Sequence, residues 1–438
     1  MDRGHPGLYR LVAVLALVVG GCAPSASASA PAPSAADLVA AAVEGSPSPA
    51  PSITIETATQ VPSVTPAPTA SPTPTPAPTP TIAKPLKSTP APTPAPKPAA
   101  GWTVPRRIGK ASNCVTVTAV IDAASRYHVA AECDGTIKYY VSIDSGRSWK
   151  GQVLAHPAGR MDLDPKIGFD GDRVYVAFTR IVPDGGCGGG RGPSVGVYYR
   201  SRVVPGGTWS AAKRIGPAAD TLESFQVAAG TLHVTVTGAD ALGYYETLKG
   251  TASKRYAISD QSVGGTSMRV GTDGRARIVY TGKDGIQYAR FTGSGFSTRT
   301  IPGTTVWDLH PVLALDTGDK SHVAFTRNEP ATCGEGPVST WYASNASGSW
   351  KTQQISKAFG DTSIEVDGAT GRVRVVIGSA SGVRYFKSVS DGSWKGATLA
   401  STRWAMSPVL SRNPATGAIL VAYIDGSASA TIRVVTTK

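Results

Sequence analysis

The feature that most restricts the fold of this chain is an internal repeat of a two-strand pattern. Residues 162–165 resemble residues 308–311, and residues 176–180 resemble residues 323–327. In both copies a glycine-containing turn separates the two segments. Copies of lower identity lie at 268–280, 364–377 and 408–423. A repeat of this kind predicts a fold made of stacked copies of one small unit.

Each pair of segments is followed by an aromatic segment, and several are followed by a Gly-Ser-Trp type turn and a fourth short segment. Alternating β-branched and small residues bounded by Gly and Asp favour strands throughout. Four short strands in every 43–59 residues are typical of a propeller blade. The sequence therefore predicts an all-β, seven-bladed β-propeller. The first residues of the innermost strands align as Thr116, Asp164, Glu223, Ser267, His310, Thr362 and Ser407.

The last repeat ends with the chain at Lys438 and lacks an outer strand. Residues 102–109 read like residues 209–216, which form the predicted fourth strand of the second blade. We therefore expect residues 102–109 to complete the seventh blade and close the ring, which leaves short, protected edges.

The segment before the repeats predicts export. Arg3 and Arg10 precede an uncharged run of 11 residues, too short to cross a bilayer, and residues 19–22 resemble the lipobox of bacterial lipoproteins. That resemblance implies cleavage before Cys22 and lipidation of Cys22, which anchors the protein to the cell membrane; cleavage elsewhere, giving a freely secreted protein, is the alternative. Residues 1–21 are the predicted signal peptide, 22–101 a disordered Pro-rich linker without aromatic residues, and 102–438 the propeller domain.

Four further cysteines in an exported domain favour disulfides. Cys114 and Cys133 are symmetric about a turn near residues 122–125, so we expect them to face each other across one hairpin. Cys187 and Cys333 each lie 23 residues past equivalent positions in the two most similar blades, and could bridge two loops. The cysteines show no Cys-x-x-Cys pair, and we expect neither a metal nor a cofactor.

Residues 142–149 fit the Asp-box pattern Ser-x-Asp-x-Gly-x-x-Trp, and the domain resembles the sialidase-like β-propellers that carry it. The residues of the motif are Ser142, Asp144, Gly146 and Trp149. We expect a structural role for them, because the Asp can accept hydrogen bonds from turn amides while Gly permits a positive φ and Trp packs beneath the turn. In that family these turns lie on the face opposite the active site.

The aligned ring of polar residues predicts a candidate site at the mouth of the central channel, although a water-filled tunnel explains the same pattern. Further residues near the ring are expected on the same rim. Aromatic rings beside charged groups suit a sugar, whereas packing between blades is the alternative for the tryptophans. The expected ligand contacts are Asp164, Glu223, His310, Trp307, Trp404 and Asp308.

The formal net charge is +13, and residues 102–438 carry +12 of it. This charge favours acidic extracellular partners, although a generally solvated basic surface also explains it. No nucleic-acid recognition motif accompanies the charge, so we expect none bound. The first functional hypothesis is a monomeric, lipid-anchored propeller that binds an extracellular glycan or peptide, with the membrane contacted through the lipid anchor alone.

The alternative is a sialidase-like glycoside hydrolase. The family resemblance implies three arginines that hold the substrate carboxylate, a Tyr paired with a Glu as nucleophile, and an Asp as acid/base. Here Glu223 is the candidate glutamate and Asp162 or Asp164 the candidate acid. The candidate arginines are Arg160, Arg180, Arg327 and Arg403. The family pattern includes six blades and an Arg-Ile-Pro motif, whereas Arg107-Ile108 precedes Gly109 here.

Overall fold

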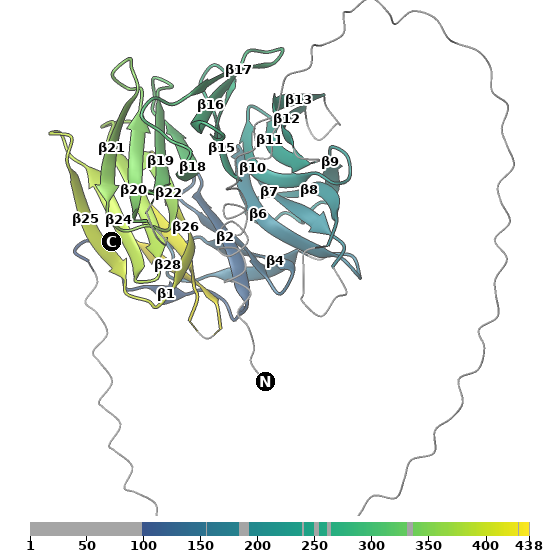
Figure 1. The fold of residues 1–438 in the computed structure, drawn as a ribbon. Helices are drawn as coiled ribbons and strands as arrows, with labels where there is room; N and C mark the ends of the chain where they lie inside the picture. The colour runs from purple at the N-terminus through teal and green to yellow at the C-terminus, as the bar shows by residue number, and fades with distance from the viewer. Residues whose placement is uncertain are drawn as a thin grey trace, which may run out of the picture. The chain divides into compact units, whose positions relative to one another are not determined.

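The computed structural model describes residues 99–154, 156–183, 192–238, 241–248, 254–260, 264–330, 336–427 and 429–437. These residues form 28 strands in seven four-stranded sheets whose strand pairs are all antiparallel. The sheets follow one another around a ring, as the progression of colour in Figure 1 shows, so the predicted seven-bladed propeller is confirmed. None of the described residues forms a helix that could cross a membrane. The predicted signal peptide, Cys22 and nearly all of the linker lie outside the described residues.

The blades are numbered in chain order, and their strands are given from the innermost outward. Blades 1 to 3 contain β2 (Cys114–Ile121), β3 (Tyr127–Cys133), β4 (Thr136–Ser142), β5 (Lys150–Leu154); β6 (Met161–Asp170), β7 (Arg173–Ile181), β8 (Ser194–Val203), β9 (Lys213–Ile215); β10 (Thr221–Ala228), β11 (Thr231–Gly238), β12 (Ala241–Leu248), β13 (Arg255–Ser259). Blades 4 to 6 contain β14 (Gly264–Val270), β15 (Ala276–Gly282), β16 (Gly285–Phe291), β17 (Phe296–Thr300); β18 (Asp308–Leu315), β19 (Ser321–Asn328), β20 (Val338–Ser344), β21 (Lys351–Ser356); β22 (Asp361–Val366), β23 (Val373–Ser379), β24 (Gly382–Ser388), β25 (Trp394–Ala400). Blade 7 contains β26 (Ala405–Arg412), β27 (Ile419–Asp425), β28 (Thr431–Thr436) and β1 (Arg106–Arg107).

The ring is closed by its own beginning, as the sequence predicts. Arg106 pairs with Val434, and Trp102 forms an isolated bridge to Thr437. Figure 1 shows β1 beside β28. Trp102 is only 6% exposed and meets the Tyr385 ring edge-on at 5.0 Å, so the closing segment is fixed by packing between blades 6 and 7 as well as by backbone hydrogen bonds.

The innermost strands contact one another around the ring but do not pair through their backbones. Their amides are satisfied by side chains of the preceding blade instead. In this way the hydroxyls of Ser224, Ser267 and Ser363 accept from the N–H groups of Met268, Leu313 and Leu410 at 3.2, 3.0 and 3.1 Å. Ser411 accepts from Ile121 at 2.9 Å across the closure between blades 7 and 1. The polar residues of these strands therefore hold the blades in register.

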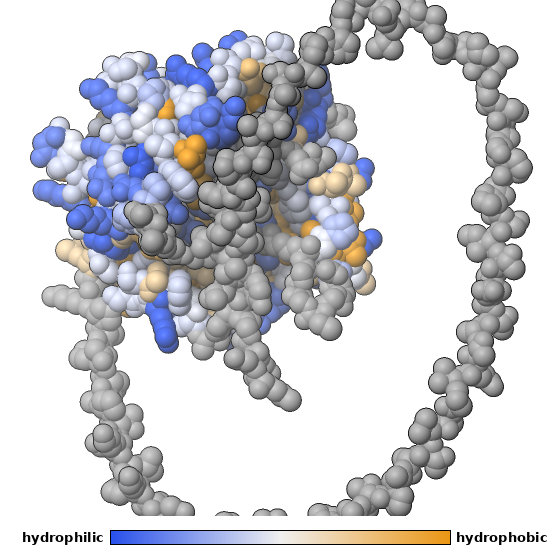
Figure 2. All heavy atoms as spheres, in the orientation of Figure 1, coloured by the Kyte–Doolittle hydropathy of each residue, from blue (hydrophilic) through white to orange (hydrophobic). Residues whose placement is uncertain are grey.

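The second strand of each blade is the most deeply buried, because both faces of its sheet are covered by neighbouring blades. Every residue of β3 and of β27 is buried. Phe178 and Phe325 occupy equivalent places in β7 and β19, and both have no exposed surface. Most of the surface visible in Figure 2 is hydrophilic or neutral, as expected when apolar side chains gather between blades.

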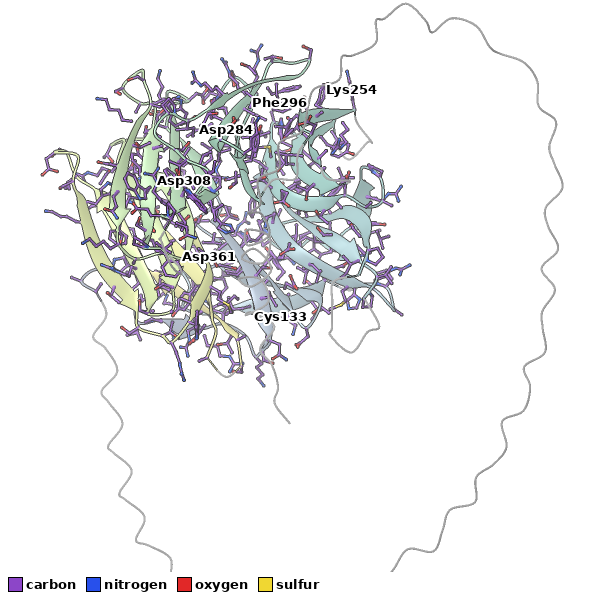
Figure 3. The ribbon with its side chains drawn as sticks, in the orientation of Figure 1. Cys133, Lys254, Asp284, Phe296, Asp308 and Asp361 are labelled. Carbon is purple, nitrogen blue, oxygen red and sulfur yellow. A yellow bond between two sulfur atoms is a disulfide. The ribbon has the colours of Figure 1, made fainter. Side chains whose placement is uncertain are left out.

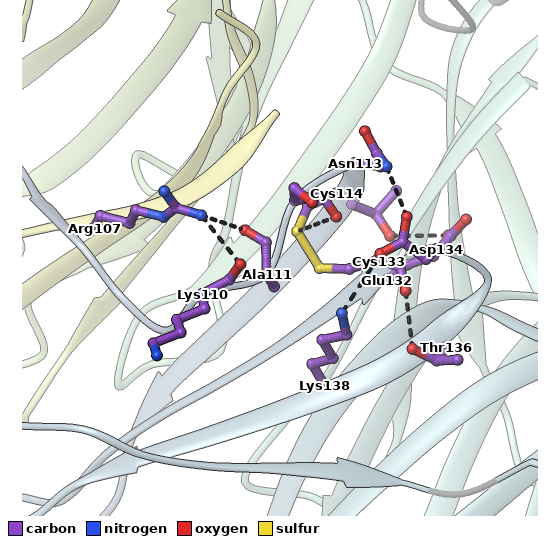
Figure 4. Close-up of a disulfide and its surroundings, with 12 residues drawn as sticks. Arg107, Lys110, Ala111, Asn113, Cys114, Glu132, Cys133, Asp134, Thr136 and Lys138 are labelled. Carbon is purple, nitrogen blue, oxygen red and sulfur yellow. Dashed lines mark hydrogen bonds and ion pairs between the residues drawn. A yellow bond between two sulfur atoms is a disulfide. The ribbon is translucent and has the colours of Figure 1, made fainter. Parts of the chain in front are cut away.

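We call the end of the propeller at which the innermost strands begin the mouth face, and the other end the opposite face. Cys114 and Cys133 pair directly at the mouth end of β2 and β3 and form the predicted disulfide (Figure 4). Cys187 and Cys333 lie outside the described residues. The described chain begins near Trp102, which pairs with the last residues of β28, and therefore starts at the opposite face.

Candidate functional site

Strand pairing aligns the seven blades and tests the predicted ring of residues at the mouth. Counted from the paired residues, Thr116, Asp164 and Ser407 occupy the position of His310 in their blades, as expected. In the other three blades the position is filled by Leu222, Gly265 and Asp361, where Glu223, Ser267 and Thr362 were expected. The ring is thus polar in five blades, and Glu223 lies one residue farther along β10.

The difference arises because the innermost strands bulge. The strand register of blade 3 shifts at Glu223, between Leu222 and Ser224, whereas blade 6 pairs from Asp361 without a shift. A bulge adds one residue to one strand only. It therefore shifts the strand pairing by one residue relative to an alignment made from the sequence pattern. The Glu223 carboxylate accepts a hydrogen bond from Thr237 at 3.0 Å.

Three residues of the ring share a backbone conformation that side chains rarely adopt. Asp164, His310 and Ser407 have φ values of 52°, 52° and 47°, and each precedes a proline. Such residues persist where the surroundings fix them. The N–H of Asp164 donates to Glu132 at 3.0 Å, and the N–H of Ser407 donates to Asp361 at 2.7 Å, in each case a carboxylate of the preceding blade. The mouth is therefore built from bulges held by the neighbouring blade.

Two buried ion pairs lie beneath the mouth in blades 2 and 5. Arg180 donates from Nε and Nη2 to the two carboxylate oxygens of Asp162 at 2.7 and 2.9 Å. Arg327 donates in the same manner to Asp308, both bonds measuring 2.7 Å. Figure 3 labels Asp308 of blade 5 and Asp361 of blade 6. Asp162 and Asp308 are 1% and 0% exposed, so Asp308 lies below the surface rather than where a ligand would contact it.

Each of these arginines also stacks on an aromatic ring of the third strand. The guanidinium of Arg180 lies 4.5 Å from the centre of the Tyr198 ring, and that of Arg327 lies 4.0 Å from the Trp341 ring. A guanidinium that is bidentate to a carboxylate and stacked on a ring has few N–H groups left for a second anion. Arg180 and Arg327 therefore hold a carboxylate of the protein itself.

The remaining candidates at the mouth differ in exposure. Trp307 is half-buried, whereas Trp404, its equivalent in blade 7, is 49% exposed. His310 and Arg403 are exposed, while Asp164 and Arg160 are half-buried. Sequence reasoning missed two exposed apolar residues on the same face, Val306 at 50% and Phe359 at 47%. They precede the inner strands of blades 5 and 6, so exposed apolar side chains occur at the mouth of three consecutive blades.

The channel interior holds charged groups that sequence reasoning also missed. Arg269 of β14 and Glu365 of β22 occupy equivalent positions in blades 4 and 6. Burial raises the pKa of Glu365 to about 7, although Arg269, Arg412 and Arg374 act in the opposite direction. An arginine and a glutamate thus occupy the same level of two innermost strands, two blades apart.

The turn at residues 142–149 lies on the opposite face, at the end of β4. Asp144 accepts from the N–H and the hydroxyl of Ser148 at 2.8 and 2.6 Å, and Ser142 donates to it at 2.7 Å. These hydrogen bonds hold the pKa of Asp144 well below its usual range. Trp149 Nε1 donates to the carbonyl of Gly146 at 3.2 Å, and its ring packs against the core. The carboxylate of Asp144 is therefore occupied within its own turn.

Three histidines are buried inside blades 1, 3 and 5. Nδ1 of His128 lies within hydrogen-bonding distance of the Tyr139 hydroxyl, and the corresponding distances from His233 to Tyr244 and from His322 to Tyr342 are both 2.6 Å. Burial lowers the pKa of all three histidines, and that of His233 falls to about 4. These pairs are internal contacts between the second and third strands rather than parts of the mouth. Within the described residues, no group of three His, Cys, Asp or Glu could hold a metal ion.

Comparison with known proteins supports the propeller fold and gives no information on the chemistry of the site. No family model matches the chain, and no curated protein matches its sequence. The WD40 β-propeller domain of Doa1 matches with a TM-score of 0.50 at 12% identity, covering 77% of this chain and 97% of that one. A protein of unknown function from Dyadobacter fermentans gives 0.49 at 11%, covering 77% and 100%. The NanB sialidase of Streptococcus pneumoniae gives 0.45 at 10%, covering 77% and 70%. At these identities the likeness shows the propeller fold alone, and sialidases are among the propellers that the chain resembles.

Proposed function

We propose that this protein is an extracytoplasmic propeller, anchored by a lipidated Cys22, that binds an extracellular glycan at its mouth face. The observation that carries the proposal is the exposure of Trp404 and Phe359, together with half-buried Trp307, at the mouth of blades 5 to 7. Large aromatic side chains are normally buried, and exposed ones gathered on one face favour a binding site.

The groups around these rings fit a sugar. An aromatic ring can stack on the apolar face of a pyranose, while polar neighbours bind its hydroxyls. Arg403 is exposed and can donate such hydrogen bonds, and exposed His310 can donate or accept them. Asp361 of blade 6 is exposed at the place equivalent to that of His310. The strained backbone at His310 and Ser407 supports the same proposal, because such conformations gather where a site must be preorganised.

A glycosidase mechanism of the sialidase kind receives less support from the same geometry. Arg180 and Arg327 each hold a buried aspartate, and Asp162, one of the two candidate acids with Asp164, is one of those aspartates. Arg403 is exposed and could meet a substrate carboxylate, but the residues at the mouth do not gather three free arginines in the described part of the chain. Binding without turnover is therefore the proposal.

Binding to an array of glycans, with the purified protein, tests the proposal. We expect Trp404→Ala to lose at least tenfold in affinity, because one stacking surface is removed without disturbing the core. Ile143→Ser is the matched control, since Ile143 is 70% exposed on the opposite face. Equal losses in both variants, or binding to peptides instead of glycans, would contradict the proposal. Steady hydrolysis of a fluorogenic sialoside that is abolished in Glu223→Gln would establish the enzyme instead.

The proposed anchor is tested separately. In a bacterium that expresses the full chain, incorporation of a labelled fatty acid and recovery with membranes should both be lost in Cys22→Ala. Labelling that persists in Cys22→Ala would place the modification elsewhere.

A further inference from the structure

A hollow of about 230 Å³ lies where the closing strand of blade 7 meets the β4–β5 turn of blade 1. Arg106, Arg107 and Gly109 line it from the closing segment, and Arg147, Ser148 and Trp149 line it from the turn. A smaller hollow of about 40 Å³ shares Arg106 and Arg147. Residues from both ends of the domain thus meet in one site, far from the mouth.

Among the described residues, none of the three arginines of this hollow forms an ion pair, and two of them are held by backbone carbonyls. Arg107 Nη2 donates to the carbonyls of Lys110 and Ala111, both at 3.1 Å, as Figure 4 shows. Arg147 Nε donates to the carbonyl of Asp144 at 3.0 Å. Arg106 has no side-chain partner among the described residues. All three side chains are exposed, so their remaining N–H groups face solvent.

Other arginines of the domain behave differently. Arg180, Arg277, Arg327, Arg374, Arg412 and Arg433 each form an ion pair with an aspartate. The carboxylate of Asp144, close to the hollow, accepts hydrogen bonds from Ser142 and Ser148, although its charge still attracts Arg147. The hollow is therefore lined by three arginines with one carboxylate nearby, which gives it an excess of positive charge.

We propose that this hollow is a binding site for a phosphate or sulfate group, carried by an extracellular molecule. A tetrahedral oxyanion has several acceptor oxygens and is well matched to guanidinium groups, which present several N–H donors. Ser148 and Trp149 line the same hollow and can contact the rest of the molecule that carries the oxyanion. The site is independent of the glycan contacts proposed at the mouth.

Binding at this place has a structural consequence. Arg106 and Arg107 belong to the two-residue strand that closes the ring, whereas Arg147 belongs to blade 1. An anion held by both sides binds only the closed propeller, and a ligand that binds the native state alone stabilises it. We therefore expect the anion to raise the Tm of the protein as well as to bind saturably.

Titration of the purified full chain with inorganic phosphate and with sulfate, at constant ionic strength set by chloride, tests the site. Saturable binding and a rising Tm are expected for the wild type. Arg106→Gln and Arg147→Gln should each weaken binding at least tenfold while leaving the Tm without anion unchanged, because both side chains are exposed. Arg372→Gln is the matched control, since Arg372 is also exposed and has no side-chain partner among the described residues.

Two further measurements identify the source of the oxyanion and separate this site from the proposed glycan site. Glycerol phosphate and a galactose sulfate distinguish the source of the oxyanion by their relative affinities, with a preference for either supporting the site. Trp404→Ala should bind the anion as the wild type does, so loss of glycan binding and loss of anion binding can be told apart. Non-saturable binding, or equal weakening by Arg372→Gln and Arg106→Gln, would overturn the proposal.

Discussion

Blade 1 cross-links its two innermost strands at the mouth end by a disulfide, whereas blades 2 and 5 do so by an ion pair. The pair Cys114–Cys133 in blade 1 stands where Asp162–Arg180 and Asp308–Arg327 stand in blades 2 and 5. Each pair joins the innermost strand to the second strand at the mouth end of the hairpin, just before the bulge. A covalent bond and a bidentate ion pair thus serve as alternative cross-links at one position of the repeat.

The comparison indicates that the two strands are cross-linked next to the bulge at the mouth. The kind of cross-link decides which conditions or substitutions destabilise the hairpin. A disulfide stabilises mainly by restricting the unfolded chain, and it depends on oxidising conditions. A buried ion pair restricts the folded state, and its loss leaves one charge without a partner. The disulfide of blade 1 is also next to the closure of the ring, where residues 112–114 follow the closing strand.

The largest expected effect comes from breaking one ion pair on one side. Asp308→Ala leaves the guanidinium of Arg327 buried without its carboxylate, and we expect a loss of about 3–5 kcal/mol in the free energy of unfolding. Denaturant unfolding measures it. A loss below that of an exposed substitution such as Arg372→Gln would show that the pair does not cross-link the hairpin.

Removal of the disulfide should cost somewhat less. Cys114→Ala combined with Cys133→Ala should destabilise the protein by about 3 kcal/mol, as the loop-closure model gives for loops of this size. The unfolding midpoint of the double variant, compared with that of the reduced wild type, checks this value. Agreement between the two would assign the effect to the covalent bond, and a much larger loss in the variant would assign it to packing.

The buried histidine of blade 3 should make the stability of the protein depend on pH. The pKa of His233 is about 4 in the folded protein, below the value of about 6.5 for a free histidine, so the unfolded chain binds more protons as the pH falls. Stability from this residue is present above pH 6.5 and falls toward pH 4, by about 2 kcal/mol at pH 5. His233→Gln should therefore flatten the dependence of unfolding free energy on pH between these values. Unchanged pH dependence in the variant would refute the assignment.

The smallest effect is expected when both partners of an ion pair are replaced together. Asp162→Leu with Arg180→Met removes both charges while keeping apolar volume, and such exchanges are often neutral, within about 1 kcal/mol. Unfolding of the double variant beside Asp162→Ala measures the difference. A loss as large as in the single variant would mean that blade 2 needs the charges themselves.

The repeat and its closure could be predicted from the sequence because both depend on local pattern. The similarity of residues 102–109 to an outer strand indicated the closure, and the symmetry of Cys114 and Cys133 about a turn indicated their pairing. Asp162, Arg180, Asp308 and Arg327 were also found, through their matching places in two blades. Their mutual pairing was not, because only the register between strands shows that each aspartate faces its arginine.

The register of the mouth could not be predicted for a physical reason. A bulge inserts a residue without altering which residues are apolar, so Glu223 and Ser267 could not be distinguished in sequence from Leu222 and Gly265. Phe359 and Val306 were missed because a hydrophobic residue gives no sign in sequence that it will be exposed. The buried His–Tyr pairs were missed because they join residues 11 or 20 positions apart on neighbouring strands.

The pairing of Arg106 with Val434 has a consequence for how the protein is made. Blade 7 cannot be completed until Val434 has been synthesised, so a nascent chain that stops short of Val434 carries an open array of blades with an unfinished edge. Contacts between such distant parts of a chain form slowly. For the exported protein that we propose, this arrangement delays completion of the ring until the whole of blade 7 has been synthesised.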